Sequence, residues 1–97
     1  MTAIRWSPQA ADDLEAIRNF IARDSAHYAK LVVQRIVAAI EMLATSPEMG
    51  RVVPELRNPE VREIIVGAYR VVYRHQRGIV EISTIFHGSR LFRENDI

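Results

Sequence analysis

The chain has 97 residues and a formal net charge of +1, with 48% hydrophobic and 26% charged residues; this balance excludes a disordered protein and indicates one globular domain spanning residues 1–97. It contains no cysteine, which excludes disulfides, thiolate catalysis and zinc–thiolate sites and fits a reducing cytoplasm. The first residues lack the features of a signal peptide, and no apolar run approaches the ~20 residues of a membrane helix, so we expect a cytoplasmic protein.

The positive charge is carried almost entirely by arginine. Of the 13 basic residues 12 are arginine, and Lys30 is the single lysine. Residues 51–97 hold eight arginines, two more than their acidic residues. The planar guanidinium group binds phosphate and carboxylate through two parallel hydrogen bonds, which the lysine ammonium does not. This composition favours an anionic partner such as RNA or an acidic protein, and the alternative is that these are ordinary surface charges.

A short strand and a helix are predicted at the start of the chain. Residues 3–6 are the strand candidate, Ser7 is placed to cap the helix, and Pro8 occupies its first position. Apolar residues then recur at helical spacing, at Ala10, Leu14, Ile17 and Ile21.

A second helix is predicted after a very short turn, with Ser25 as its cap and with Pro47 and Gly50 beyond its end. Its apolar positions are Ala29, Val33, Ile36, Ile40 and Leu43. Three further side chains widen this stripe, namely Val32, Val37 and Ala44. The short connection predicts that the two helices form an antiparallel hairpin.

The second half of the chain reads as a loop followed by three strands. Residues 47–60 contain three prolines and one glycine and predict a loop. Residues 61–67, 69–76 and 79–87 are rich in β-branched and aromatic residues and are separated by tight-turn signals. The order is therefore β-α-α-β-β-β, an α+β domain in which the helical hairpin packs on one face of a small antiparallel sheet.

Strand alternation assigns side chains to the two faces of this sheet. In the middle strand one face carries Tyr69, Val71, Tyr73 and His75, and the other carries Arg70, Val72, Arg74 and Gln76. Two aromatic residues and a valine suit a core better than two arginines, so we expect Arg70 and Arg74 on the face away from the helices.

The last strand is predicted to turn its more apolar set toward the helices. This set is Val80, Ile82, Thr84 and Phe86. His87 then falls on the open face near Arg70, and Arg90 follows three residues later. Glu81 would share that face, where an ion pair with Arg70 or Arg74 is the main alternative to a role of these arginines in binding a partner.

Taken together, these residues resemble the RelE/ParE superfamily of bacterial toxins from type II toxin–antitoxin systems. The line "VREIIVGAYRVVYRHQRGIVEISTIFHGSR" is similar to the last three strands of that family, with Arg62, Tyr69, Arg70, Tyr73, Arg74, His87 and Arg90 at its characteristic positions. The first helix resembles the family signature A-x-x-D-L-x-x-I at Ala10, Asp13, Leu14 and Ile17. The stretch "PEMGRVVPEL" resembles its P-x-x-G-x-x-x-P-E-L loop.

The resemblance implies a small toxin that is neutralised by a cognate antitoxin in a heteromeric complex. RelE-like members cut mRNA on the ribosome, whereas ParE-like members poison DNA gyrase. The sequence of the last strands resembles the ParE branch more closely. The candidates for binding the target are Arg62, Arg70, Arg74, His87 and Arg90.

Cleavage chemistry gives a separate test of the alternatives. RNA cleavage through the 2′-hydroxyl needs a base, an acid and cations for the developing phosphorane charge. Only His87, Arg70 and Arg90 suggest such a set. Glu48, Glu55 or Glu63 could serve as the base, but nothing in the sequence places one of them near His87, so no catalytic residue is assigned. The three histidines are scattered, and we expect neither a metal nor a cofactor.

The docking surface for an antitoxin has two candidates. The widened stripe of the second helix (Val32, Val37 and Ala44) is one, and an exposed sheet edge that accepts an added strand is the other.

Overall fold

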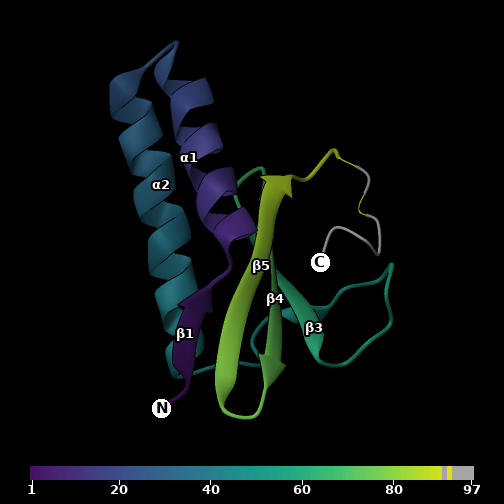
Figure 1. The fold of residues 1–97 in the computed structure, drawn as a ribbon. Helices are drawn as coiled ribbons and strands as arrows, with labels where there is room; N and C mark the ends of the chain where they lie inside the picture. Colours follow the sequence, from purple (N-terminus) through teal and green to yellow (C-terminus); the bar gives the residue numbers. More distant parts are fainter. Residues whose placement is uncertain (91, 93–97) are drawn as a thin grey trace.

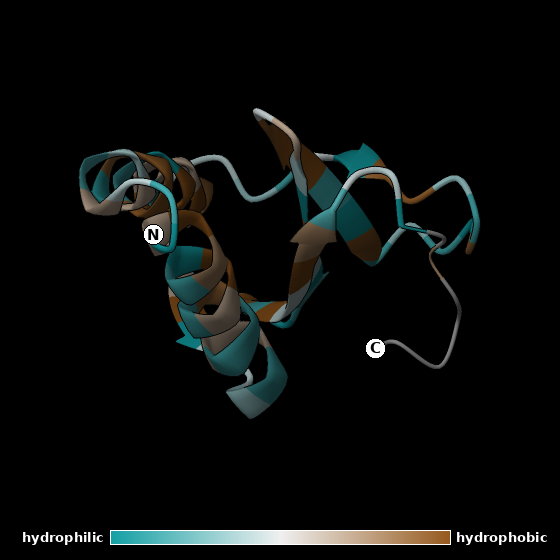
Figure 2. Ribbon diagram, turned by 90° about the horizontal axis from the view of Figure 1, so that it is seen from above, coloured by the Kyte–Doolittle hydropathy of each residue, from teal (hydrophilic) through white to brown (hydrophobic). Residues whose placement is uncertain are grey.

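The computed structural model describes residues 1–90 and 92 and has the predicted order of elements (Figure 1). The first half contains β1 (Ala3–Trp6), α1 (Pro8–Ala22), α2 (Ala26–Glu41) and a 3₁₀ turn, η1 (Met42–Ala44). The second half contains β2 (Arg51–Val52), β3 (Val61–Val66), β4 (Tyr69–Gln76) and β5 (Ile79–His87). The two helices lie together on one side of the sheet (Figure 2), which confirms the predicted α+β class.

The five strands form one sheet in the order β1-β5-β4-β3-β2. The meander of β3, β4 and β5 is antiparallel, as predicted. β1 pairs with β5 in parallel, so the sheet is mixed rather than wholly antiparallel. β2, a strand of two residues inside the predicted loop, pairs with β3 at the other edge.

Both helices begin where the sequence predicts. The Ser7 hydroxyl oxygen accepts a hydrogen bond from the Ala10 amide at 3.0 Å, and that of Ser25 accepts one from the Tyr28 amide at 3.0 Å. Ser7 also donates its hydroxyl proton to the carbonyl of Ser83 at 2.9 Å. The start of α1 is thereby attached to β5.

Neither helix of the described residues is long and apolar enough to cross a membrane.

The main core lies between the helical pair and the sheet. From α2 and η1 it receives Val32, Ile36, Ile40 and Leu43, and from the strands Ile64, Val71, Tyr73, Val80, Ile82 and Ile85. Tyr69 packs against its margin. The predicted orientation of Tyr69, Val71 and Tyr73 toward the helices is therefore confirmed.

One extra residue in β5 shifts its register against β4. Val72 lies opposite Thr84. The next residue of β4, Tyr73, lies opposite Ile82, so Ser83 has no partner in β4. Such a β-bulge reverses the alternation of the residues that follow it.

This reversal overturns the predicted faces at the end of β5. Ile85 joins the core under the helices, whereas Phe86 packs on the opposite face, so the predicted orientation of Phe86 is wrong. Thr84 lies opposite Val72, which belongs to the small core on the opposite face, so its predicted orientation is wrong too, although its hydroxyl donates to Asp13 of α1. His87 is shifted to the same face as Ile85 and Tyr69, and its predicted place on the open face is also wrong.

Asp13 completes the edge of β5 where β1 has ended. One of its carboxylate oxygens accepts the amide proton of Ile85 at 3.0 Å and the hydroxyl proton of Thr84 at 2.7 Å. A backbone donor at the sheet edge is thus satisfied by a helix side chain instead of by a neighbouring strand.

Candidate functional site

Arg70 projects from β4 on the face away from the helices, but only 9% of the residue is exposed. Its Nε and one terminal nitrogen lie 2.7 and 2.6 Å from Glu63 Oε1. Its two terminal nitrogens each donate to a carboxylate oxygen of Glu55 at 3.0 Å. The predicted face is correct, but the expectation that this guanidinium is displayed to solvent is wrong.

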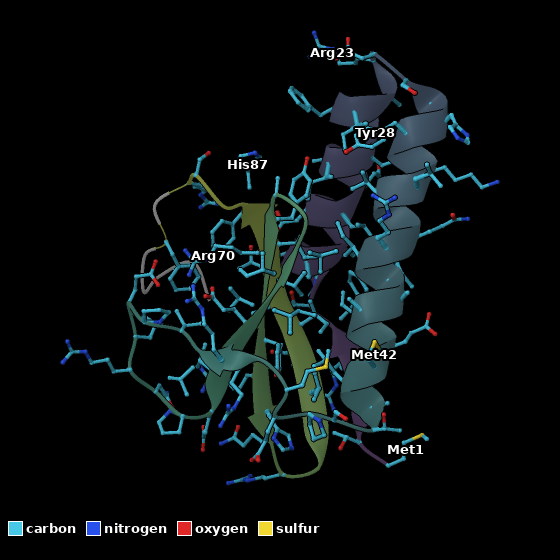
Figure 3. The ribbon with its side chains drawn as sticks, turned by 180° about the vertical axis from the view of Figure 1, so that it is seen from behind. Met1, Arg23, Tyr28, Met42, Arg70 and His87 are labelled. Carbon is cyan, nitrogen blue, oxygen red and sulfur yellow. The ribbon has the colours of Figure 1, made fainter. Side chains whose placement is uncertain are left out.

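A second, smaller core covers the face that the sequence left open. Val53 and Leu56, from the segment between β2 and β3, pack there with strand residues and Phe92. The ring of Phe92 stacks on that of Phe86, with their centroids 5.5 Å apart. The guanidinium carbon of Arg70 lies 5.2 Å from the Phe86 centroid and 5.6 Å from that of Phe92, within the range of cation–π attraction. Figure 3 shows Arg70 on this side, among the loop side chains.

Glu63 is the acid at the centre of this cluster, and its side chain has no exposed surface. One of its oxygens accepts from Arg70, and the other accepts from Nε of Arg51 at 2.6 Å. A buried carboxylate is tolerated when it is paired and hydrogen bonded, and here both oxygens are. Sequence reasoning named Glu63 only as a possible general base and missed its pairing with Arg70, although its place opposite Val72, two residues from Arg70, is a consequence of regular β3–β4 pairing.

The pairing shifts the acid–base behaviour of two groups. Hydrogen bonds from Arg70 hold the pKa of the Glu55 carboxyl below its ordinary value of 4.5. The same hydrogen bonds from the guanidinium, followed by those to Glu63, raise the pKa of Arg70, which stays a cation. We call Arg51, Glu55, Glu63 and Arg70 the ion-pair cluster; it contains two positive and two negative charges.

His87 lies at the end of β5, and no hydrogen bond or ion pair joins it to the ion-pair cluster. Its ring meets the edge of Tyr69 at a centroid distance of 5.6 Å, and its Nδ1 lies 2.7 Å from the hydroxyl oxygen of Ser89. It shares a shallow hollow with Arg51 and Arg70. The acids of this region, Glu55 and Glu63, already bind arginine, so no uncommitted carboxylate of residues 1–90 and 92 lines that hollow.

The other predicted target-binding arginines are dispersed. Arg62 lies opposite Tyr73, on the helix side of the sheet, and donates to the Gly50 carbonyl at 2.9 Å. Arg74 is half exposed, and its Nη1 lies 3.5 Å from Oε2 of Glu60, so its ion-pair partner is Glu60 and not Glu81. The guanidinium carbon of Arg90 lies 5.3 Å from the Phe86 centroid. The five candidates do not converge on one site.

Comparison with known proteins identifies the family. The family model of the ParE toxin of the type II toxin–antitoxin system parDE matches residues 4–92. The chain belongs to the ParE toxin family.

Relatives of this toxin agree with that assignment. "Toxin RelE2" of Caulobacter vibrioides is 35% identical over 92 residues, which cover 94% of this chain and the whole of the relative. A solved structure titled "Chromosomal ParDE TA system from P. aeruginosa" superposes with a TM-score of 0.74 at 24% identity. It covers 90% of this toxin and 96% of that chain, and it supports the fold. The family assignment implies a cognate antitoxin as partner.

An apolar groove runs between the helices and the β3–β4 turn of the toxin. Its lining is Ile21, Tyr28, Val32, Arg35, Val66, Gly67, Ala68 and Tyr69. Tyr28 is 52% exposed there, and Arg35 is the one charged group of the lining. The helical pair extends beyond the sheet at this end (Figure 1), so the groove opens to solvent.

The residues predicted to bind the antitoxin are less exposed than expected. Val32 is only 8% exposed, because it belongs to the main core and only borders the groove. Val37 and Ala44 are partly buried and do not line the groove. The stripe of α2 is thus largely occupied by the toxin's own sheet and first helix.

A free sheet edge lies beside the groove. The Val61 carbonyl accepts the Val53 amide proton, so Val61 turns its backbone groups toward β2. Backbone groups of alternate residues point to the same side of a strand, so Glu63 and Ile65 do likewise. β2 begins at Arg51, opposite Glu63. Within residues 1–90 and 92 no strand therefore faces Ile65, whose side chain is 55% exposed.

Proposed function

We propose that this toxin acts by binding DNA gyrase and that it does not cut RNA. The observation that supports this most directly is the saturation of Arg70 by Glu55 and Glu63. A ribonuclease of this kind needs a cation whose donors are free to stabilise the phosphorane. Arg70 could bind a phosphate only after breaking its ion pairs with the carboxylates of Glu55 and Glu63.

The position of His87 supports the same proposal. A histidine can serve as acid or base near neutral pH, but RNA cleavage requires a second group on the other side of the reacting phosphate. The neighbouring acids Glu55 and Glu63 are committed to arginine. Because the described residues offer no second group for general acid–base chemistry, His87 is better explained as a strand-end residue packed on Tyr69.

The test is inhibition of supercoiling by purified gyrase at equimolar toxin. We expect inhibition, accumulation of cleaved DNA, and a DNA-damage response with filamentation in cells. His87→Ala should leave all three unchanged, because His87 is exposed at the end of β5 and belongs to neither core. Gyrase that supercoils normally in the presence of stoichiometric toxin would overturn the proposal.

The alternative is a ribosome-dependent mRNA endonuclease, which the name of the Caulobacter relative, "Toxin RelE2", and the hollow shared by His87 and Arg70 favour. Primer extension on translated mRNA decides between the two targets. Cuts in the A-site codon that disappear with His87→Ala would establish the alternative. Both targets place the toxin in the cytoplasm.

For the antitoxin we propose the apolar groove as the docking site. The groove combines exposed Tyr28 with one cation, Arg35, and so fits an apolar segment that carries a carboxylate. Antitoxin segments that dock on a toxin are often disordered alone and fold on binding. A strand added along the free edge at Ile65 would extend the same contact.

Neutralisation in cells tests this docking site. Tyr28→Glu should prevent rescue by the antitoxin while leaving toxicity intact, because Tyr28 is half exposed and lies outside the core. Met42→Glu is the matched control, since Met42 is 58% exposed at the opposite end of the same helical layer (Figure 3). Equal rescue of both variants would exclude the groove.

A further inference from the structure

The open face of the sheet is uncovered at one end, and arginines gather there. The end is formed by β1 and the β4–β5 turn, which lie side by side near the N terminus (Figure 1). A hollow at this end is lined by Arg5, Arg74, Gln76, Arg77, Ile79 and Glu81. We call this hollow the arginine corner; the small core around Phe92 covers only the other part of the same face.

Strand pairing places two of these arginines in one row. Arg5 lies opposite Glu81 across the β1–β5 pair, and Arg74 lies opposite Glu81 across the β4–β5 pair. Directly opposed residues share a face, so all three side chains project to the same side. Neither arginine forms an ion pair with Glu81, and within residues 1–90 and 92 only Arg74 of the two has a carboxylate partner, Glu60 at 3.5 Å.

Arg77 adds a third guanidinium at the turn itself. Its φ of 55° and that of Gly78, 75°, are both positive, as in the two-residue turn that favours asparagine and glycine. A side chain as long as arginine occupies this left-handed conformation at a cost that asparagine largely avoids. Among the described residues Arg77 has no acid partner.

We propose that the arginine corner binds the phosphodiester backbone of a nucleic acid. Arg5 and Arg77, which pair with no carboxylate of the described part of the chain, supply guanidinium groups, and the Gln76 amide adds a neutral donor. Glu81 lowers the net positive charge of the corner, so few phosphate contacts are expected. Backbone contacts of this kind position a protein on nucleic acid without reading its sequence. The assignment concerns a different surface from Arg70 and His87, and it does not depend on gyrase being the target.

The experiment measures binding of purified full-length toxin to a short duplex DNA and to a single-stranded RNA of equal length, by fluorescence anisotropy over a range of salt concentrations. We expect sequence-independent binding that weakens as salt rises. If an arginine contacts one phosphate, its removal should reduce the magnitude of the slope of log K against log salt by about 0.9 on duplex DNA and by about 0.7 on a single strand. The two arms show which nucleic acid the corner prefers.

Arg77→Asn is the informative variant, because asparagine suits the left-handed turn and should not impair folding. Arg57→Asn is its matched control: Arg57 is also exposed, also has a positive φ, 53°, and does not line the corner. Weakened binding by Arg77→Asn and by Arg5→Gln, with Arg57→Asn like wild type, would support the site. Equal losses from Arg77→Asn and Arg57→Asn, no binding of either nucleic acid, or binding of polyglutamate instead would overturn it.

Discussion

Tyr73 joins the loop before β2 to the centre of the sheet. Its buried hydroxyl accepts the Gly50 amide proton at 3.1 Å and donates to the Pro47 carbonyl at 2.8 Å. Burial raises the pKa of this phenol, so it stays protonated and able to donate. The spacing of Pro47 and Gly50 in the sequence therefore serves a contact with a residue more than twenty positions away, which periodicity alone does not reveal.

Gly50→Ala should destabilise the toxin through this contact. A Cβ at Gly50 would lie 2.6 Å from the Tyr73 hydroxyl and 2.6 Å from the Glu63 carbonyl oxygen. Overpacking of this kind costs about 1–3 kcal/mol. Urea denaturation measures the loss, and Tyr73→Phe combined with Gly50→Ala should recover part of it. An unchanged midpoint for Gly50→Ala would show that the loop moves away without cost.

Glu63→Gln tests the centre of the ion-pair cluster. The substitution keeps the shape but removes the charge between Arg51 and Arg70, leaving buried positive charge undercompensated, and should cost on the order of 3 kcal/mol in free energy of unfolding. Glu60→Gln is the control, because the exposed pair of Glu60 with Arg74 should contribute less than about 1 kcal/mol. Similar denaturation midpoints for the two variants would contradict a structural role of Glu63.

At the scale of elements, the helices, β1 and the three long strands could be predicted because their signals are local. Caps at Ser7 and Ser25 and the changes of hydrophobic period suffice for them. The bulge at Ser83 could not be predicted, since it depends on how β5 meets β4 and α1 in three dimensions. The cover over Arg70 could not be predicted either, because Val53 and Phe92 reach it from segments without periodicity. Arg70 and Arg74 do lie on the predicted face, but Arg70 is covered there by the small core and paired with Glu55 and Glu63.

Asp13 should matter more than its exposed neighbour on α1. Asp13→Ala removes the acceptor for the Thr84 hydroxyl and the Ile85 amide, and hydrogen bonds to a charged group contribute about 1.5–3 kcal/mol. Asp12→Ala is the matched control, since Asp12 is exposed one position away. Thermal denaturation compares them, and amide exchange at Ile85 should accelerate only in Asp13→Ala. Equal stability of the two variants would refute this role.

The segment between β2 and β3 should loosen in acid. Because the pKa of Glu55 is lowered in the folded protein, its contribution to stability is complete above the ordinary value of 4.5 and is lost as pH falls through the lower folded value. Urea unfolding followed from neutral pH down to acid should show this loss. In Glu55→Gln that component of the pH dependence should vanish. A wild-type curve that is unchanged by the substitution would be inconsistent with the pairing.

At the scale of the whole molecule, the two faces of one sheet carry two cores of different kinds. The larger is apolar and lies under the helices, and the smaller contains the ion-pair cluster and the stacked rings of Phe86 and Phe92. Among the described residues, the surfaces left for partners are the groove beside the helices, the free edge of β3 and the arginine corner, which lies on the part of one face that the smaller core does not cover. Contacts with other molecules are therefore expected at the margins of the sheet.

The unpaired backbone at Ile65 has a further consequence for the toxin on its own. An exposed edge strand with an exposed isoleucine can form backbone hydrogen bonds with the same edge of a second copy. Toxin without its antitoxin would therefore aggregate as its concentration rises. Toxin released from its antitoxin would then stay monomeric and active only at low concentration. Light scattering of Ile65→Lys and of the wild type, compared over a range of concentrations, would show how much this edge contributes to aggregation.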